Sequence, residues 1–186
     1  MIQFSCTPNH LRYTRALQSN NDIIVCTGPS STGKILIPCR IASMKKLKII
    51  ITRPSKVLDV NIEYLPGAWT QSMYKVFNQN MSQNEINRLI SIEPLDNLRG
   101  VQLDNVFIIA TDMQNSTQRQ MNALIDKKGI NTKLVITGQL EYICSNNGLF
   151  NIVQNIDKTQ MEYVSLDNMD TIREVRDNNK LKLYIF

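Results

Sequence analysis

The sequence predicts an α/β fold in which a mostly parallel sheet carries helices on both faces, giving a three-layer sandwich. Short apolar runs alternate along the chain with helix-like or loop segments, which is the order that parallel strands with crossover helices require. The runs 49–51 and 106–109 are continuously apolar, as strands buried on both faces are. A glycine-rich segment between the first apolar run and a helix-like stretch is the third indication.

Local patterns predict the individual elements. Ser82, with Glu85 three residues later, makes a capping box for a helix, and Ser116-Thr117 can cap the next one. Helices are expected at about 33–45, 83–90, 116–127 and 147–155. Strands are expected at Ile23–Cys26, Lys48–Thr52, Val106–Ala110, Lys133–Thr137, Met161–Ser165 and Leu181–Phe186.

Length and composition fit one globular domain. The chain has 186 residues, of which 42% are hydrophobic and 20% charged, and it shows no internal repeat and no low-complexity tract. We therefore expect a single domain over residues 1–186. Pro54, Pro66-Gly67 and Pro94 interrupt the stretch from about 54 to 99, so we expect an irregular insertion there, beside the glycine-rich segment.

The sequence also bears on location and cysteine chemistry. No apolar run approaches the ~20 residues that span a bilayer, and no basic segment followed by an apolar stretch opens the chain. We expect no membrane partner and an intracellular, cytoplasmic location. Cys6, Cys26, Cys39 and Cys144 are widely spaced, with one histidine, His10, to complement them, so buried thiols are favoured over a zinc site, disulfides or a reactive nucleophile.

The net charge of +5 is compatible with a nucleic-acid partner, because clustered Lys and Arg release counterions from phosphates. Only the segment 45–48, Lys-Lys-Leu-Lys, forms a basic cluster. A solvated helix end accounts for that cluster better, because cations favour a helix C-terminus.

The glycine-rich segment has the form of a phosphate-binding P-loop and reads Gly28-Pro29-Ser30-Ser31-Thr32-Gly33-Lys34. In such a loop, backbone N–H groups and the positive end of the following helix surround the phosphates, and the lysine adds a charge. A hydroxyl residue that binds Mg²⁺ normally follows the lysine, but this chain has Ile35 there. The groups that bind phosphate are present, and the hydroxyl that binds the metal is absent.

The strand at 106–110 ends where a P-loop NTPase carries acidic residues that order Mg²⁺ and activate water. Here the strand is followed by Thr111 and Asp112, so Asp112 is the one carboxylate available as a catalytic group and metal ligand. A threonine hydroxyl adds no negative charge. We therefore expect Mg²⁺ to bind weakly, if at all.

Three further side chains follow predicted strands, where ligands of doubly wound sheets lie. Arg53 could reach phosphate or nucleic acid, or simply be solvated at its strand end. Gln139 could orient water near the γ-phosphate, or be a polar turn residue. Arg173 could act as an arginine finger, or form a helix salt bridge with Asp170 or Glu174.

A series of short motifs follows the chain in order. It consists of the loop at 28–34 together with Ile51-Thr52-Arg53-Pro54, Tyr64-Leu65-Pro66-Gly67, Glu93-Pro94-Leu95, Leu98-Arg99-Gly100, Phe107-Ile108-Ile109, Met113-Gln114-Asn115-Ser116-Thr117, Gln120-Met121 and Val135-Ile136-Thr137-Gly138. In this order, over about residues 7–175, the motifs resemble the PhoH-like family of P-loop ATPases, especially the versions carried by large DNA viruses and phages. The resemblance implies a RecA-like core, ATP binding, a helicase-like relationship to RNA or single-stranded nucleic acid, and often a ring of subunits.

The departures from the family pattern fall on catalytic positions. The family has Thr where this chain has Ile35, and Asp-Glu where it has Thr111-Asp112. The segment 137–142 carries Gln139 in place of the family's acidic residue, and its last position, a family glutamine, is also replaced. A family Asn-Gln, whose implied role is contact with adenine, reads Asn9-His10. The replacements at Ile35 and at Thr111-Asp112 therefore remove both groups that hold the metal in the family.

The arginines are only partly retained. The family's Arg-Gly-Arg becomes Arg99-Gly100-Val101, which removes one of two arginines, while Arg53, Arg99 and Arg173 stand at matching positions. Our leading hypothesis is an ATP-binding PhoH-like protein with weak or no hydrolysis, serving in a larger assembly. The alternatives are an active RNA-coupled ATPase whose metal site is completed by Asp112 and another acidic residue, and an interaction protein with a vestigial loop.

Overall fold

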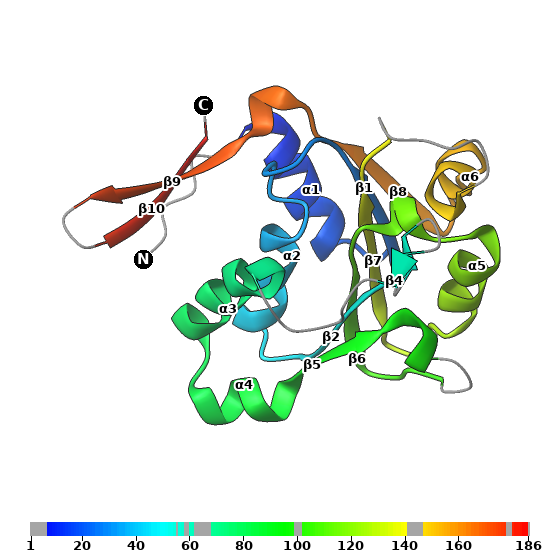
Figure 1. Cartoon of the computed structure of the whole chain (residues 1–186), viewed down its shortest axis with the longest axis horizontal. Helices are drawn as coiled ribbons and strands as arrows, with labels where there is room; N and C mark the ends of the chain where they lie inside the picture. Colours follow the sequence, from blue (N-terminus) through cyan, green and yellow to red (C-terminus); the bar gives the residue numbers. More distant parts are fainter. Residues whose placement is uncertain are drawn as a thin grey trace.

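The computed structural model describes residues 7–54, 56–57, 60–61, 68–98, 102–140, 147–177 and 180–185, and its centre is a six-stranded sheet in which all paired strands run parallel (Figure 1). The strand order is β5-β2-β6-β7-β1-β8, so the ends of β1, β6 and β7 lie side by side. The predicted α/β fold is confirmed. The strands are β1 (Ile23–Thr27), β2 (Lys48–Arg53), β5 (Ile90–Pro94), β6 (Val106–Ala110), β7 (Lys133–Gly138) and β8 (Met161–Ser165).

Helices cover both faces of the sheet (Figure 1). The first four helices contribute to one buried apolar cluster, and the last two contribute to a second cluster on the opposite face. In β2, Ile49 and Ile51 belong to the first cluster and Ile50 to the second, which explains the continuous apolar run. The helices are α1 (Pro8–Gln18), α2 (Leu36–Met44), α3 (Ala68–Asn80), α4 (Gln83–Leu89), α5 (Gln118–Asp126) and α6 (Gly148–Gln154).

Three helices begin with a capping box, in which the cap side chain and the side chain three residues later bond each other's backbone N–H groups. The predicted box of Ser82 and Glu85 opens α4. Thr117, one of the two caps predicted for α5, opens that helix. In α1 the box pairs Thr7 with His10, an unusual partner that the sequence pattern did not reveal.

Several elements were not predicted. These are α1, α3, β5, the strand β9 (Ile172–Asp177) and the short antiparallel pair β3 (Lys56–Val57) and β4 (Val60–Asn61). The last predicted strand is present as β10 (Lys180–Ile185), but it pairs antiparallel with β9 in a hairpin that projects from the body (Figure 1). The predicted irregularity at about 54–99 does not extend over 68–98, where α3, α4 and β5 are regular and β5 joins the sheet.

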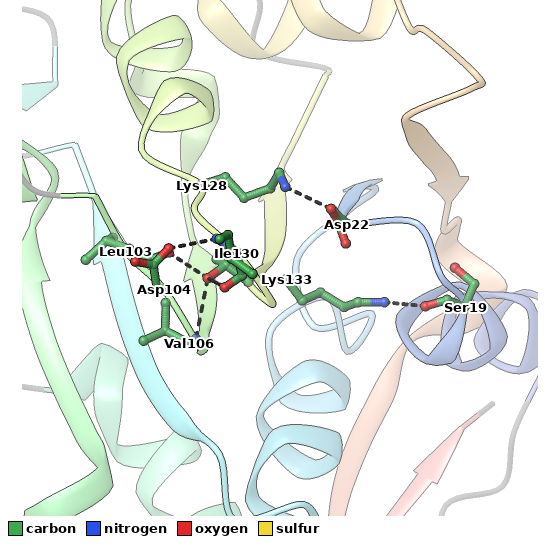
Figure 2. A network of polar contacts seen from close by, with 9 residues as sticks. Ser19, Asp22, Leu103, Asp104, Val106, Lys128, Ile130 and Lys133 are labelled. Carbon is green, nitrogen blue, oxygen red and sulfur yellow. Dashed lines mark hydrogen bonds and ion pairs between the residues drawn. The ribbon is translucent and has the colours of Figure 1, made fainter.

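Polar contacts close the turns at the amino edge of the sheet, where the strands begin (Figure 2). Lys128 forms an ion pair with Asp22, with 2.8 Å between Nζ and Oδ2. The Asp104 carboxylate accepts the N–H of Ile130 at 2.7 Å, and Lys133 Nζ donates to the carbonyl of Ser19 at 2.7 Å. The opposite, carboxyl edge holds the candidate site.

Candidate functional site

The glycine-rich loop lies between β1 and α2, so a helix start does follow it. The helix begins at Leu36 rather than at 33, because Gly33 has a φ of 87°, outside the helical region. A Cβ at Gly33 would lie 2.6 Å from Ile172 Cδ1, and one at Gly28, whose φ is 150°, would lie 2.5 Å from the carbonyl oxygen of Leu166. Both positions therefore require glycine.

Three loop carbonyls are held by donors from outside the loop. Two of these donors, His10 and Tyr13, come from α1 and are buried. The third is the backbone N–H at the start of β9. The pairs are Ile172 N to Ser31 O at 2.7 Å, His10 Nε2 to Thr32 O at 2.9 Å and Tyr13 OH to Lys34 O at 2.9 Å.

The side chain of Lys34 turns back over the loop and is only 8% exposed. Its Nζ donates to the carbonyl of Pro29 and lies 3.5 Å from Oγ1 of Thr32, which itself donates to Pro29 O at 2.9 Å. Among the hydrogen bonds of the described residues, none is donated by the backbone N–H groups of residues 30–33. The loop therefore offers a cation and a run of donors to a ligand.

The carboxyl end of β7 lies against this loop. Gln139 Nε2 donates to Ser30 Oγ at 2.6 Å, and the Gln139 N–H donates to Gln114 Oε1 at 3.1 Å. The N–H of Gly28 donates to the carbonyl of Gly138 at 3.2 Å. Gln139 thus contacts the loop, in keeping with its predicted position, and also links the loop to the segment after β6.

The positions expected to hold Mg²⁺ fit a divalent cation poorly. Thr111 is fully buried, and its N–H and Oγ1 both face the carbonyl of Thr52, at 2.8 and 3.4 Å. Asp112 has a left-handed backbone with φ 54°, and its carboxylate makes no hydrogen bond to the described residues. Ile35 packs against the apolar cluster beneath α2. Of the three positions Ile35, Thr111 and Asp112, the last is the one with a charged oxygen.

Two of the three candidate arginines, Arg53 and Arg173, lie in strands that the structure describes. Arg53 is only 9% exposed, so the interpretation of a solvated strand-end arginine is wrong. Arg173 lies in β9, opposite Tyr184, which overturns the alternative of a salt bridge within a helix, because the segment is a strand. Arg99 lies outside the described residues.

Metal and thiol chemistry find little support in the described residues. They contain no group of three His, Cys, Asp or Glu side chains that could hold a metal ion. Cys26 and Cys39 are free and buried, as predicted. Burial raises the pKa of Cys26 to about 12 and also raises the pKa of Cys39. Cys6 and Cys144 lie outside the described residues.

Asp170, which the sequence offered only as a salt-bridge partner, joins the two segments that hold the loop. Its buried carboxylate accepts hydrogen bonds from Thr7 Oγ1, from Asn9 Nδ2 at 3.0 Å and from the N–H of Asp167 at 2.7 Å. Burial acts to raise the pKa of Asp170, but these donors outweigh it and the pKa is lowered. The spacing of Asp167 and Asp170 matches a capping box, which was the available signal.

A strand, a glycine-rich turn with a buried lysine, and a helix at the carboxyl edge of a parallel sheet define the class of P-loop α/β proteins. The family model for PhoH-like proteins matches residues 4–184, and the chain belongs to this family.

Its relatives are distant in sequence. It is 27% identical over 182 residues to a PhoH-like protein of Bacillus subtilis, covering 85% of this chain and 56% of that protein. It is 25% identical over 201 residues to Protein PhoH of Escherichia coli K12, covering 94% and 56%. A PhoH-like protein of Synechocystis is 27% identical over 146 residues, covering 69% and 44%. The chain spans about half the length of the curated relatives it matches.

Proposed function

We propose that the chain is an ATP-binding PhoH-like protein whose ATP hydrolysis is weakened or lost. The observation that carries this proposal is a contrast within one site. The loop offers backbone donors and the Lys34 ammonium to phosphate. The neighbouring positions that would hold Mg²⁺ are occupied by Ile35 and Thr111.

Phosphate binding draws on groups that the chain retains. Backbone N–H groups before a helix bind anions because the helix dipole adds a partial positive charge there. The Lys34 ammonium is bonded to oxygens of its own loop, so a triphosphate can replace neutral acceptors with charged ones, which form stronger hydrogen bonds.

Hydrolysis makes a demand that the chain meets poorly. Phosphoryl transfer needs Mg²⁺ across the β- and γ-phosphates and a placed water. Losing one transition-state donor commonly costs about 10²–10³ in rate, and linked losses do not add. Asp112 is the residual candidate for catalysis and for weak metal binding.

Titration of the protein with ATP, with and without Mg²⁺, and a steady-state phosphate-release assay test the proposal. We expect micromolar binding that depends little on Mg²⁺, and turnover below about 0.1 s⁻¹, which is under the ordinary range of enzymes. Faster turnover that Lys34→Ala abolishes would establish the alternative of an active, RNA-coupled ATPase. If the protein binds no ATP at all, the alternative of an interaction protein with a vestigial loop is established.

A restored variant sharpens this test. Ile35→Thr, Thr111→Asp and Asp112→Glu together return the family's metal-binding residues. Without metal, the carboxylate that replaces the Thr111 hydroxyl faces the carbonyl of Thr52 in a buried position, so we expect a loss of about 3 kcal/mol in stability that Mg²⁺ with ATP recovers. Recovered hydrolysis shows that the remaining scaffold is competent.

The resemblance extends the proposal to partners. We propose a subunit of a nucleic-acid-associated or viral assembly, in a ring of copies, in the host cytoplasm or the virion. None of the helices in the described part of the chain combines the length and the apolar character that a bilayer-spanning segment needs. The basic cluster supports RNA binding weakly, because Lys45 caps the end of α2 and Lys46 pairs with Glu85 at 2.7 Å. Sedimentation of the protein with and without single-stranded RNA tests both RNA binding and assembly with further copies of the chain.

A further inference from the structure

His10 connects the first turn of α1 with the P-loop through both ring nitrogens. The ring is 1% exposed. The N–H of Thr7 donates to Nδ1 at 3.4 Å, and Nε2 lies 2.9 Å from the carbonyl oxygen of Thr32. A backbone N–H can only donate and a carbonyl can only accept, so the neutral ring with its proton on Nε2 satisfies both partners. Both nitrogens are therefore engaged within the protein.

The bond to Thr32 fixes the direction of a peptide group. In a planar trans peptide, the carbonyl of one residue and the N–H of the next point in opposite directions. Because the Thr32 carbonyl points at His10, the N–H of Gly33 points away from α1. The Lys34 carbonyl, which accepts from Tyr13 OH, is held toward the same helix in the same way.

The backbone angles of the loop agree with this orientation. The φ angle is positive at Ser31 (62°) and at Gly33 (87°) and is not positive at Thr32 or Lys34. Successive N–H groups in a turn conformation form one concave surface that binds anions. A non-glycine residue at positive φ costs roughly 1–2 kcal/mol, so outside contacts are needed to hold Ser31 there.

We propose that His10 is a positioning residue for the phosphate cradle: by donating to the Thr32 carbonyl, it keeps the Gly33 N–H directed at a bound polyphosphate. This inference rests on the proposed function. It makes His10 part of anion binding rather than of base recognition, because neither ring nitrogen is left for adenine. A glutamine can replace it, since the amide offers one acceptor and one donor and suits the third position of a capping box. Phenylalanine keeps a ring and offers neither.

Three variants of the full chain test the proposal with ATP and inorganic tripolyphosphate as probes. We expect His10→Phe to weaken binding of both probes about tenfold, the upper range for one hydrogen bond. His10→Gln should stay within about twofold of the original protein. Ser82→Ala, which removes the capping box of the distant helix α4, should lower the melting temperature without changing either affinity.

The outcomes separate this inference from the proposed function. Unchanged affinity in His10→Phe, or an equal loss in His10→Gln, overturns the role of His10 while leaving ATP binding in place. If the original protein binds neither probe, the proposed function fails and the cradle fails with it. Nitrogen-15 spectra give a direct check, because the chain has a single histidine: a proton on Nδ1 instead of Nε2 contradicts the geometry.

Discussion

The two edges of the sheet treat their polar groups in opposite ways. At the amino edge, the side chains that surround the turns bond one another or the nearby backbone, as Asp22 does with Lys128 and Asp104 with the N–H of Ile130 (Figure 2). At the carboxyl edge, the protein holds the carbonyls of the P-loop and leaves the N–H groups of residues 30–33 without an acceptor among the described residues.

This difference separates stability from binding on one scaffold. Parallel strands bring all their carboxyl ends to one edge, so the loops that can meet a ligand gather there. Polar groups satisfied internally contribute to stability, whereas donors left open contribute mainly when an anion arrives. Substitutions at the amino edge should therefore change stability alone, and those at the loop should also change affinity.

The largest effect is expected for Gly28→Ala, which should lower the free energy of unfolding by about 2–4 kcal/mol. The new Cβ would lie 2.5 Å from the carbonyl oxygen of Leu166, in a backbone conformation with φ 150°. It would also disturb the bond from Leu166 N to Thr27 O. Urea unfolding measures the loss, and a loss below about 0.5 kcal/mol, the scale of ordinary surface substitutions, contradicts the geometry.

Lys34→Ala should separate ATP binding from stability most clearly. Removing a charge-assisted partner of phosphate should weaken ATP binding by roughly 10–100-fold. Stability should fall by no more than about 1.5–3 kcal/mol, the usual net value of a hydrogen bond to a charged group such as the one that Lys34 Nζ donates to the carbonyl of Pro29. Calorimetric titration and thermal unfolding on the same samples measure both, and a variant that loses stability without losing affinity reverses the assignment.

At the amino edge, Gly129→Ala is the matched glycine substitution. Its Cβ would lie 1.8 Å from Asp104 Oδ1, the end of a side chain that can turn away, and 2.8 Å from the backbone carbonyl oxygen of Leu103, which has to shift. Turning away breaks the bond from the Ile130 N–H to Asp104, so we expect a loss of at least about 1–2 kcal/mol with unchanged ATP affinity. Altered affinity would show that the two edges are coupled.

The sequence predicted what is encoded locally. The run Gly28–Lys34, the strand before it and the helix after it were recognisable because glycines, a lysine and apolar runs act within a few residues. β5 was missed because Ile90–Pro94 mixes polar residues with a terminal proline and is only half-buried. Such a strand at the sheet edge lacks the continuous apolar signature of β2 and β6.

The contacts that shape the loop depend on pairs far apart in the chain. His10 meets Thr32 only after α1 has packed against β1 and α2, and Ile172 meets Ser31 only when the start of β9 lies against the loop. The capping box of α1 was not recognised from the sequence, because the residue three positions after Thr7 is His10 and the usual residue there is Glu or Gln. Chemistry at the loop was therefore predictable, whereas its support from outside was not.

The smallest effect is expected for the ion pair of Lys128 with Asp22. The Asp22 side chain is 57% exposed, so water and salt screen the attraction despite the 2.8 Å distance. Lys128→Ala should cost at most about 0.5 kcal/mol, and Asp22→Asn the same, with no further loss in the double variant. Urea unfolding at low and high salt measures this cycle. Should the pair instead contribute more than about 1 kcal/mol, or should its loss weaken ATP binding, the amino edge would carry more than local closure of its turns, and the separation between the two edges would fail.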